Sequence, residues 1–222
     1  MRRDIVQGLI FITHHPVLRK TTACAATGNL FIAMQISLNL LFLVRVLHVP
    51  PALAGLFSAV GSLGGVVGGM LAASIGRRVG SPRIIWFSLL VFGAPALILP
   101  LAQPGWRAAL FVLGYGVAAF ANAIFGASQL GYRQSVCPPG MRGRMNAASR
   151  WIIWGTLPFG GLLGGLLGST IGIRASIWIA YAGSWAAGFL VFFSPLRYAR
   201  DVSDLPTGEI LSVSPDKQKV DR

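Results

Sequence analysis

Six stretches of this chain contain no charged residue, and each is longer than the roughly 20 residues that a helix needs to cross a bilayer. They run over 21–44, 46–76, 84–106, 108–132, 151–173 and 175–196. A single Arg or Lys at the centre of such a helix costs about 2.5–3.5 kcal/mol on insertion. We therefore predict an all-α membrane protein with six transmembrane helices, at about 21–45, 52–75, 84–102, 108–130, 147–169 and 175–195.

The basic residues lie in clusters between these stretches. Only Arg45, Arg107 and Arg174 of the 19 Lys and Arg fall in the connections of one side, and all the others fall on the opposite side. Cytoplasmic loops carry such an excess of positive charge, so both termini and the loop at 133–150 are predicted to be cytoplasmic. The net charge of +13 is therefore interpreted as a topology signal and not as a nucleic-acid-binding surface, since only 11% of the chain is charged.

Three regions follow from the same pattern. Residues 1–20 are predicted to form a short interfacial lead-in on the cytoplasmic face, 21–196 the six-helix bundle, and 197–222 a polar, disordered cytoplasmic tail. The pair His14-His15 is too isolated for a metal site, and Cys24 and Cys137 predict no disulfide framework.

Glycines recur at four-residue spacing in the second and the fifth predicted helix. Gly61, Gly65 and Gly69 lie in "GSLGGVVGGM", and Gly160, Gly164 and Gly168 lie in "PFGGLLGGLLG". Such stripes let a neighbouring helix approach closely in lipid. Their occurrence in both halves predicts a repeat of three helices, and an odd number of crossings per repeat makes the two copies inverted, as in many transporters. Simple helix dimerisation is the alternative.

Polar side chains gather on two of the predicted helices. Tyr115, Asn122 and Gln129 are seven residues apart and share one face of the fourth helix, while Gln35 and Asn39 share a face of the first. One interpretation is a water-filled substrate pathway between these helices. The other is a set of interhelical hydrogen bonds, and the residues alone do not decide between them.

Several kinds of chemistry lack the residues that they need. No Asp or Glu occurs between Asp4 and Asp201, so a proton relay through membrane carboxylates is not expected within this chain. There is no Gly-rich nucleotide loop and no nucleophile–base pair. We therefore expect no enzyme activity, no cofactor and no metal site.

Four segments resemble a known family. "DIVQGLIFITHHPVLR", "LAASIGRRVGSPR", "RQSVCPPGMRGRMNAASR" and "SPLR" are similar to segments in the second half of major facilitator superfamily transporters, in particular the bacterial drug, macrolide and siderophore exporters. The third segment is the most specific. The resemblance covers roughly 4–198, nearly all of this chain but half of a family member, which has two six-helix halves around a central cavity.

The resemblance also implies roles for particular residues. It places the first, second, fourth and fifth helices near the cavity and the third and sixth outside. Gly76, Arg77 and Arg78 are similar to the family's basic loop, which acts as a conformational latch, although Ala73 and Ser74 stand where an acidic residue is often found. "WGTLPFGG" is similar to a kink motif of antiporters, in which Pro158 would bend the fifth helix.

The resemblance and the residues together predict the C-terminal half of an alternating-access exporter of a small amphiphilic molecule, as a fragment or a split subunit. The expected partners are the lipid bilayer, the substrate, and an N-terminal six-helix half or a second copy, with no nucleic acid. The expected location is a bacterial inner membrane. The rival interpretation is a membrane interaction or regulatory protein that transports nothing.

Overall fold

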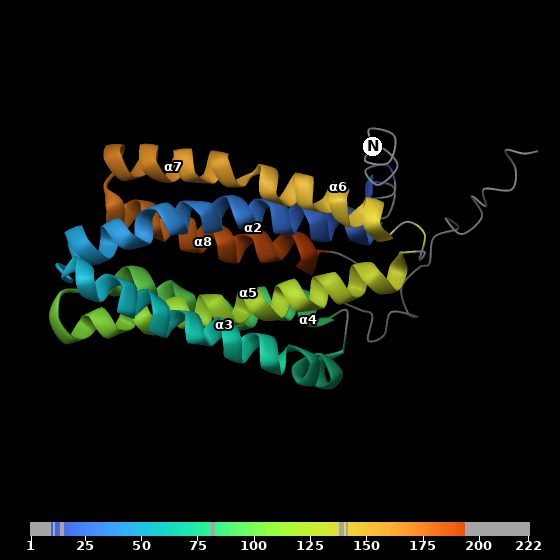
Figure 1. Ribbon diagram of the computed structural model, residues 1–222, viewed down its shortest axis with the longest axis horizontal. Helices are drawn as coiled ribbons and strands as arrows, with labels where there is room; N and C mark the ends of the chain where they lie inside the picture. Colours follow the sequence, from blue (N-terminus) through green and yellow to red (C-terminus); the bar gives the residue numbers. More distant parts are fainter. Residues whose placement is uncertain are drawn as a thin grey trace, which may run out of the picture.

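Long helices running side by side make up most of the part of the chain that the computed structural model describes, residues 10, 12–13, 16–80, 83–137, 140 and 142–193 (Figure 1). Six helical segments in this part of the chain are long and apolar enough to cross a membrane: Val17–Val46, Pro51–Val79, Arg83–Leu101, Gly105–Val136, Gly143–Thr170 and Ile173–Phe192. The prediction of an all-α protein with six membrane helices is confirmed.

Regular and irregular helical elements combine to form these spans. The first contains α2 (Pro16–Leu41) and η1 (Phe42–Val46), the second α3 (Pro51–Val79), and the third α4 (Arg83–Phe87), η2 (Ser88–Phe92) and η3 (Ala94–Leu101). The fourth contains η4 (Gly105–Ala108) and α5 (Ala109–Val136), the fifth α6 (Arg142–Gly155) and α7 (Leu157–Thr170), and the sixth α8 (Ile173–Phe192).

Several helices extend further than the charge-free stretches. The helix α3 ends at Val79 and α5 at Val136, each several residues beyond the predicted end. Backbone groups near the membrane surface still need hydrogen-bond partners, which a continued helix supplies. The exposed Arg77 and Arg78 in the last turn of α3 can keep an apolar stem beside the protein and a charged head at the surface.

The third span is the least regular. The helix tightens to 3₁₀ geometry over Ala94–Leu101, after a π-helical turn at Ser88–Phe92. Pro95 and Pro100 lie in this tightened part. Each lacks the N–H that an α-helix would use, so a uniform i to i−4 ladder cannot form here.

The first helix of each three-helix repeat packs within the other repeat. The first-span helix α2 packs against α7 and α8, whereas α5 packs against α3 and η3. Figure 1 shows α2, α6, α7 and α8 on one side of the bundle and α3, α4 and α5 on the other. The first helix of each three-helix repeat therefore packs against the second and third helices of the other repeat.

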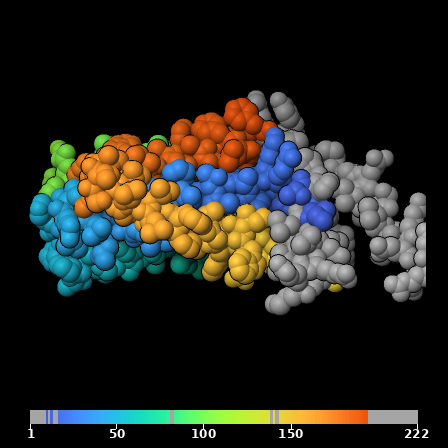
Figure 2. Space-filling model, turned by 90° about the horizontal axis from the view of Figure 1, so that it is seen from above, coloured from blue at the N-terminus to red at the C-terminus, as the bar shows by residue number. Residues whose placement is uncertain are grey.

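Glycines make the two equivalent contacts of this arrangement. A Cβ on Gly68 of α3 would lie 2.6 Å from the carbonyl oxygen of Phe120 on α5, and a Cβ on Gly164 of α7 would lie 3.2 Å from the Cα of Met34 on α2. The second span of each repeat thus packs closely on the first span of the other, as an inverted repeat requires. Figure 2 shows α6 and α7 lying across α2.

The contacting stripe on α3 differs from the predicted one. Gly61 packs on Tyr115 and Gly65 lies near Ala119, but a Cβ on Gly69 would meet nothing within 4 Å. The closest backbone approaches occur at Gly64 and Gly68 instead. Residues four apart drift by about 40° around a helix of 3.6 residues per turn, so a strict four-residue series leaves the contact face after two steps.

Basic side chains form hydrogen bonds between spans at both ends of the bundle. At the end that holds Arg19, Lys20, Arg77, Arg78, Arg83, Arg133, Arg144 and Arg150, called the basic end below, the Nζ of Lys20 donates to the carbonyl oxygen of Phe193 (2.6 Å). At the opposite end, Arg174 donates from Nη1 to Pro100 and from Nη2 to Ala102, each at 2.8 Å. These bonds satisfy carbonyls that helix ends leave without partners.

Candidate substrate cavity at the basic end

A cavity of about 340 Å³ opens between α2, α5 and α6 at the basic end. This size falls within the range of about 300–1,000 Å³ that is usual for small-molecule sites. The wall combines apolar and polar side chains: Cys24, Ala25, Asn29, Ile32, Leu89, Asn122, Phe125, Gln129, Leu130, Arg133, Arg150, Ile153, Trp154 and Ser184, with Gly28 and Gly126.

Three amides of the wall are held by hydrogen bonds to main-chain carbonyls. Gln129 donates from Nε2 to the carbonyl oxygen of Thr21 (2.8 Å), which joins α5 to α2. Asn29 donates from Nδ2 to Ile153 (3.3 Å), which joins α2 to α6. Asn122 donates to Ala118 one turn earlier in its own helix (2.9 Å). Asn122 is therefore the amide whose hydrogen bond does not connect two helices.

Arg133 is the most unusual group of the wall. Its side chain is 8% exposed, and its Nε and Nη1 atoms are enclosed without a hydrogen-bond partner among the described residues. The second arginine, Arg150, lies with its Cζ 4.9 Å from the centre of the Trp154 ring. This cation–π contact holds a second positive charge at the cavity wall.

Other predicted pathway residues lie away from this cavity. Gln35 is buried and donates to the carbonyl oxygen of Ala180 (3.1 Å), and Asn39 donates to the hydroxyl of Tyr181 (3.2 Å), so both bind α8. Tyr115 stacks on Phe111 with ring centres 5.9 Å apart. Of the five predicted pathway residues, Asn122 and Gln129 line the cavity, and Gln35 shares a small pocket of about 20 Å³ with Asn122. Asn39 and Tyr115 make contacts elsewhere.

Sequence reasoning did not select Arg133, Arg150 or Trp154 for the site. The signal for Arg133 was present, because it follows Gln129 by four residues and so extends the polar face of the same helix. Its position beyond the charge-free stretch assigned it to a loop instead. Arg150 and Trp154 reach the cavity because of how α6 packs against α2, and no local sequence pattern indicates this packing.

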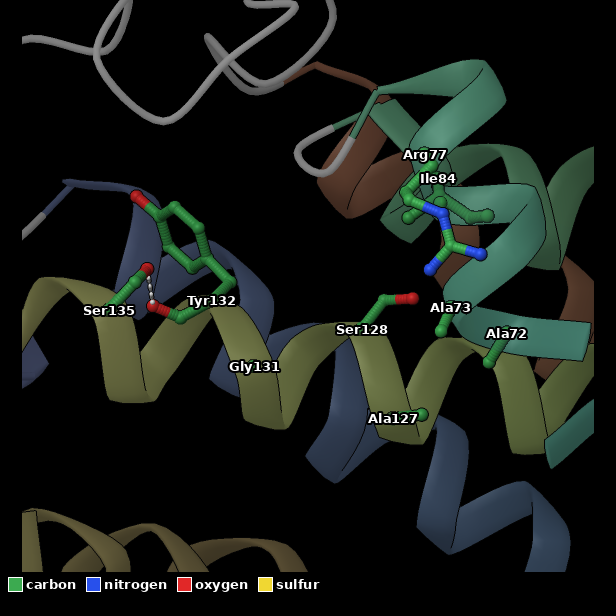
Figure 3. A pocket seen from close by; sticks show the side chains of 10 residues that line it. Ala72, Ala73, Arg77, Ile84, Ala127, Ser128, Gly131, Tyr132 and Ser135 are labelled. Atoms are coloured by element: carbon green, nitrogen blue, oxygen red, sulfur yellow. Dashed lines mark hydrogen bonds between the residues drawn. The ribbon is translucent and has the colours of Figure 1, made fainter. Parts of the chain in front are cut away.

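The predicted latch lies beside a second cavity, of about 400 Å³, between α3, α4 and α5. In Figure 3 the Arg77 side chain extends from α3 towards Ser128 of α5, while Tyr132 and Ser135 lie further along α5. Arg78 is exposed, and Gly76 lines the cavity. Gly80 ends α3 with a φ of 102°, a conformation that favours glycine.

The fifth span is interrupted close to Pro158. The helix α6 ends at Gly155 and α7 begins at Leu157, with Thr156 between them. The Thr156 hydroxyl donates to Ile153 (2.8 Å) and lies 3.1 Å from the carbonyl oxygen of Ala26 on α2. Within the described residues, no group of three His, Cys, Asp or Glu side chains forms a potential metal site.

A family model agrees with this architecture. The Major Facilitator Superfamily model matches residues 21–217, most of the chain. The chain belongs to the major facilitator superfamily. No curated protein and no solved structure gives a significant match. This facilitator chain is thus a multi-pass membrane protein of a transporter family that is generally non-enzymatic, and its six spans form half of a facilitator fold.

Proposed function

We propose that this chain is the C-terminal half of an alternating-access exporter that moves a small amphiphilic molecule of drug or siderophore type. The observation that carries the proposal is the cavity between α2 and α5, the first helices of the two repeats. Its wall presents amides and arginines beside aromatic and aliphatic side chains, a combination suited to a molecule with one polar and one apolar part.

The arrangement of the repeats supports a rocking mechanism. The cavity is bordered by α2 from one repeat and α5 from the other, and each packs mainly against helices of the opposite repeat. A tilt of one packed group against the other would change the width of the cavity. Transporters built from inverted repeats work in this way around a central site.

A second six-helix partner is part of the proposal. Large apolar side chains are exposed along α3 and α7, among them Leu63, Met70, Leu162 and Leu166. An N-terminal six-helix half covers part of this surface, or a second copy of the chain does, and lipid covers the rest. The chain has no Asp or Glu between Asp4 and Asp201, so a carboxylate for proton coupling would come from the partner.

We further propose a bacterial inner membrane as the location, with the basic end and both termini in the cytoplasm. The excess of Lys and Arg at one end of the bundle supports this orientation. Arg133 and Arg150 of the cavity wall would then lie near the cytoplasmic face, the side from which an exporter takes up its substrate.

Everted membrane vesicles from the source organism test the transport function. Vesicles with the chain intact, deleted or carrying Asn122→Leu are energised, and the uptake of anionic, neutral and cationic fluorescent dyes is compared. We expect dye uptake to fall on deletion. We also expect it to fall at least several-fold with Asn122→Leu at unchanged chain abundance, because the Asn122 hydrogen bond stays within its own helix.

The same experiment separates the rival function. The exposed apolar faces of α3 and α7 would also fit a membrane interaction protein that transports nothing. In that case the deletion leaves uptake of every dye unchanged. A loss of abundance in parallel with activity for Asn122→Leu would instead assign Asn122 to packing.

A further inference from the structure

We propose that the cavity at the basic end binds an anionic head group, such as a sulfonate, carboxylate or phosphate, and that Arg133 is its principal ligand. This proposal rests on the proposed transport function and deepens it, because it names the chemical class of the molecule that occupies the cavity.

Burial of Arg133 is the first step of the argument. An arginine stays ionised in a protein, and enclosing its donors without partners is costly. Arg133 is 8% exposed with Nε and Nη1 unpartnered, yet it lines a cavity of about 340 Å³. Ionisable residues at membrane depth usually face a cavity and serve function. An anion in the cavity would supply the missing counter-charge.

The surroundings of Arg133 offer no carboxylate from the membrane region. The six Asp and Glu of the chain are Asp4 and five residues from Asp201 onward, all outside the described residues. Arg150 adds a second positive charge to the same wall. An anion in this cavity would be attracted by both guanidinium groups.

The rest of the wall indicates what the anion is attached to. Trp154 of α6 is 57% exposed and Leu130 of α5 is 41% exposed, and both line the cavity. Ile32 and Phe125 add apolar surface from α2 and α5. A flat aromatic body can lie beside such side chains while its charged group reaches Arg133. The expected ligand is therefore an anionic amphiphile.

Two sources of such a head group are possible in a membrane: a transported amphiphile and an anionic phospholipid. Two matched dyes and two lipid compositions distinguish them. Anilinonaphthalene sulfonate carries a sulfonate, and N-phenylnaphthylamine has a closely similar aromatic skeleton without it. The full chain is isolated from its native membrane, with any partner that accompanies it, and placed in lipid discs. Energy transfer from tryptophan reports binding, with empty discs as the background.

In phosphatidylcholine discs, we expect Arg133→Gln to weaken sulfonate-dye binding by on the order of 10- to 100-fold, since hydrogen bonds to charged groups are the strong ones. Binding of the neutral dye should change less than about twofold. Arg133→Lys should restore part of the loss, because it keeps the charge but not the planar fork. Arg144→Gln, an exposed arginine of α6 outside the cavity, is the matched control and should leave both dyes unaffected.

A second variant keeps the test decisive if Arg133→Gln alters folding. Arg150→Gln removes the more exposed charge of the same cavity and should weaken sulfonate-dye binding by about three- to tenfold. Equal weakening of both dyes by Arg150→Gln would overturn the anion site, and so would the failure of both variants to weaken binding of the sulfonate dye. Replacing the neutral lipid by phosphatidylglycerol then assigns the source: competition with the dye identifies lipid as an occupant, and unchanged binding identifies a soluble amphiphile.

Transport measurements separate this proposal from the previous one. If Arg133 is required for sulfonate-dye binding but everted vesicles move no dye, the anion site stands and the transport proposal fails. If the vesicles move neutral or cationic dyes and Arg133→Gln has no effect on any dye, transport stands and the anion site fails.

Discussion

Replacing Gly68 by alanine tests the close approach of α3 to α5. The added Cβ would lie 2.6 Å from the carbonyl oxygen and 2.9 Å from the Cα of Phe120, whereas ordinary contacts begin at 3.4 Å. Both neighbouring atoms belong to the backbone, so no side-chain rotation relieves the clash. The two helices must therefore separate by roughly 0.8 Å, and gaps of about 0.5–1 Å lose a quarter to a half of each contact's dispersion energy.

The neighbouring glycine provides a matched control. A Cβ on Gly69 would meet nothing within 4 Å, so Gly69→Ala adds no clash and removes the conformational freedom of glycine in the unfolded chain. We expect Gly68→Ala to lower the free energy of unfolding by about 2–3 kcal/mol. Gly69→Ala should raise it by about 0.5–1 kcal/mol. The two variants should therefore differ by roughly 2.5–4 kcal/mol.

The comparison needs only a reversible unfolding measurement. Both variants are placed in the same detergent micelles and titrated with a denaturing detergent, and helix loss is followed by far-ultraviolet circular dichroism. Identical chemistry at adjacent positions cancels the effects of hydrophobicity and helix propensity. A difference below roughly 0.5 kcal/mol, the usual scatter of surface substitutions, would refute the close approach of these helices and with it the exchanged-repeat packing.

Three further predictions concern the second repeat, the end of η3 and the topology. In the second repeat, Gly164→Ala should be less stable than Gly165→Ala in the same titration. The difference should be smaller than for Gly68 and Gly69, because the nearest atoms of Met34 lie 3.2 Å from the Gly164 Cβ position. The reverse order of stability would contradict the repeat symmetry. Arg174→Ala should lower the free energy of unfolding by about 1.5–3 kcal/mol through loss of its two hydrogen bonds at the end of η3, and recovery of full stability by Arg174→Lys would show that charge alone matters. For topology, Gln134→Cys should react with a membrane-impermeant thiol reagent in everted vesicles and not in intact cells. Gln103→Cys, at the opposite end, should react in intact cells and not in everted vesicles. Labelling of Gln134→Cys in intact cells would invert the proposed orientation.

The number and approximate position of the membrane helices were predictable from sequence. Each span is at least as long as a bilayer requires and carries no charge at its centre, and both properties belong to a continuous segment. The exact ends were less predictable. Arg133 and Arg144 lie within helices that were expected to have ended or not yet begun. A continued helix satisfies its own backbone groups, and it can contain an arginine that is buried, as Arg133 is, or exposed, as Arg144 is.

The partners of the polar side chains were not predictable in this way. Gln35 and Asn39 suggested a face of the first helix, but their hydrogen bonds are made with α8, more than 140 residues later in the chain. Tyr115 lies on the predicted face of α5 yet packs against Phe111 and Gly61. A periodic pattern shows which residues share a face, and it contains no information on which helix that face will meet.

The sequence by itself determined that this chain spans a membrane six times, that it contains two glycine-marked repeats, and that its positive charge gathers at one end. These properties depend on the transfer of each segment from water to lipid, which is local to the segment. Only the tertiary structure decided that α2 and α5 each pack against the other repeat, that Gly64 and Gly68 make the closest approach of α3 to α5, and that Arg133 and Arg150 line one cavity. Those outcomes depend on close packing between distant segments, where a rotation of one residue around a helix changes the neighbour.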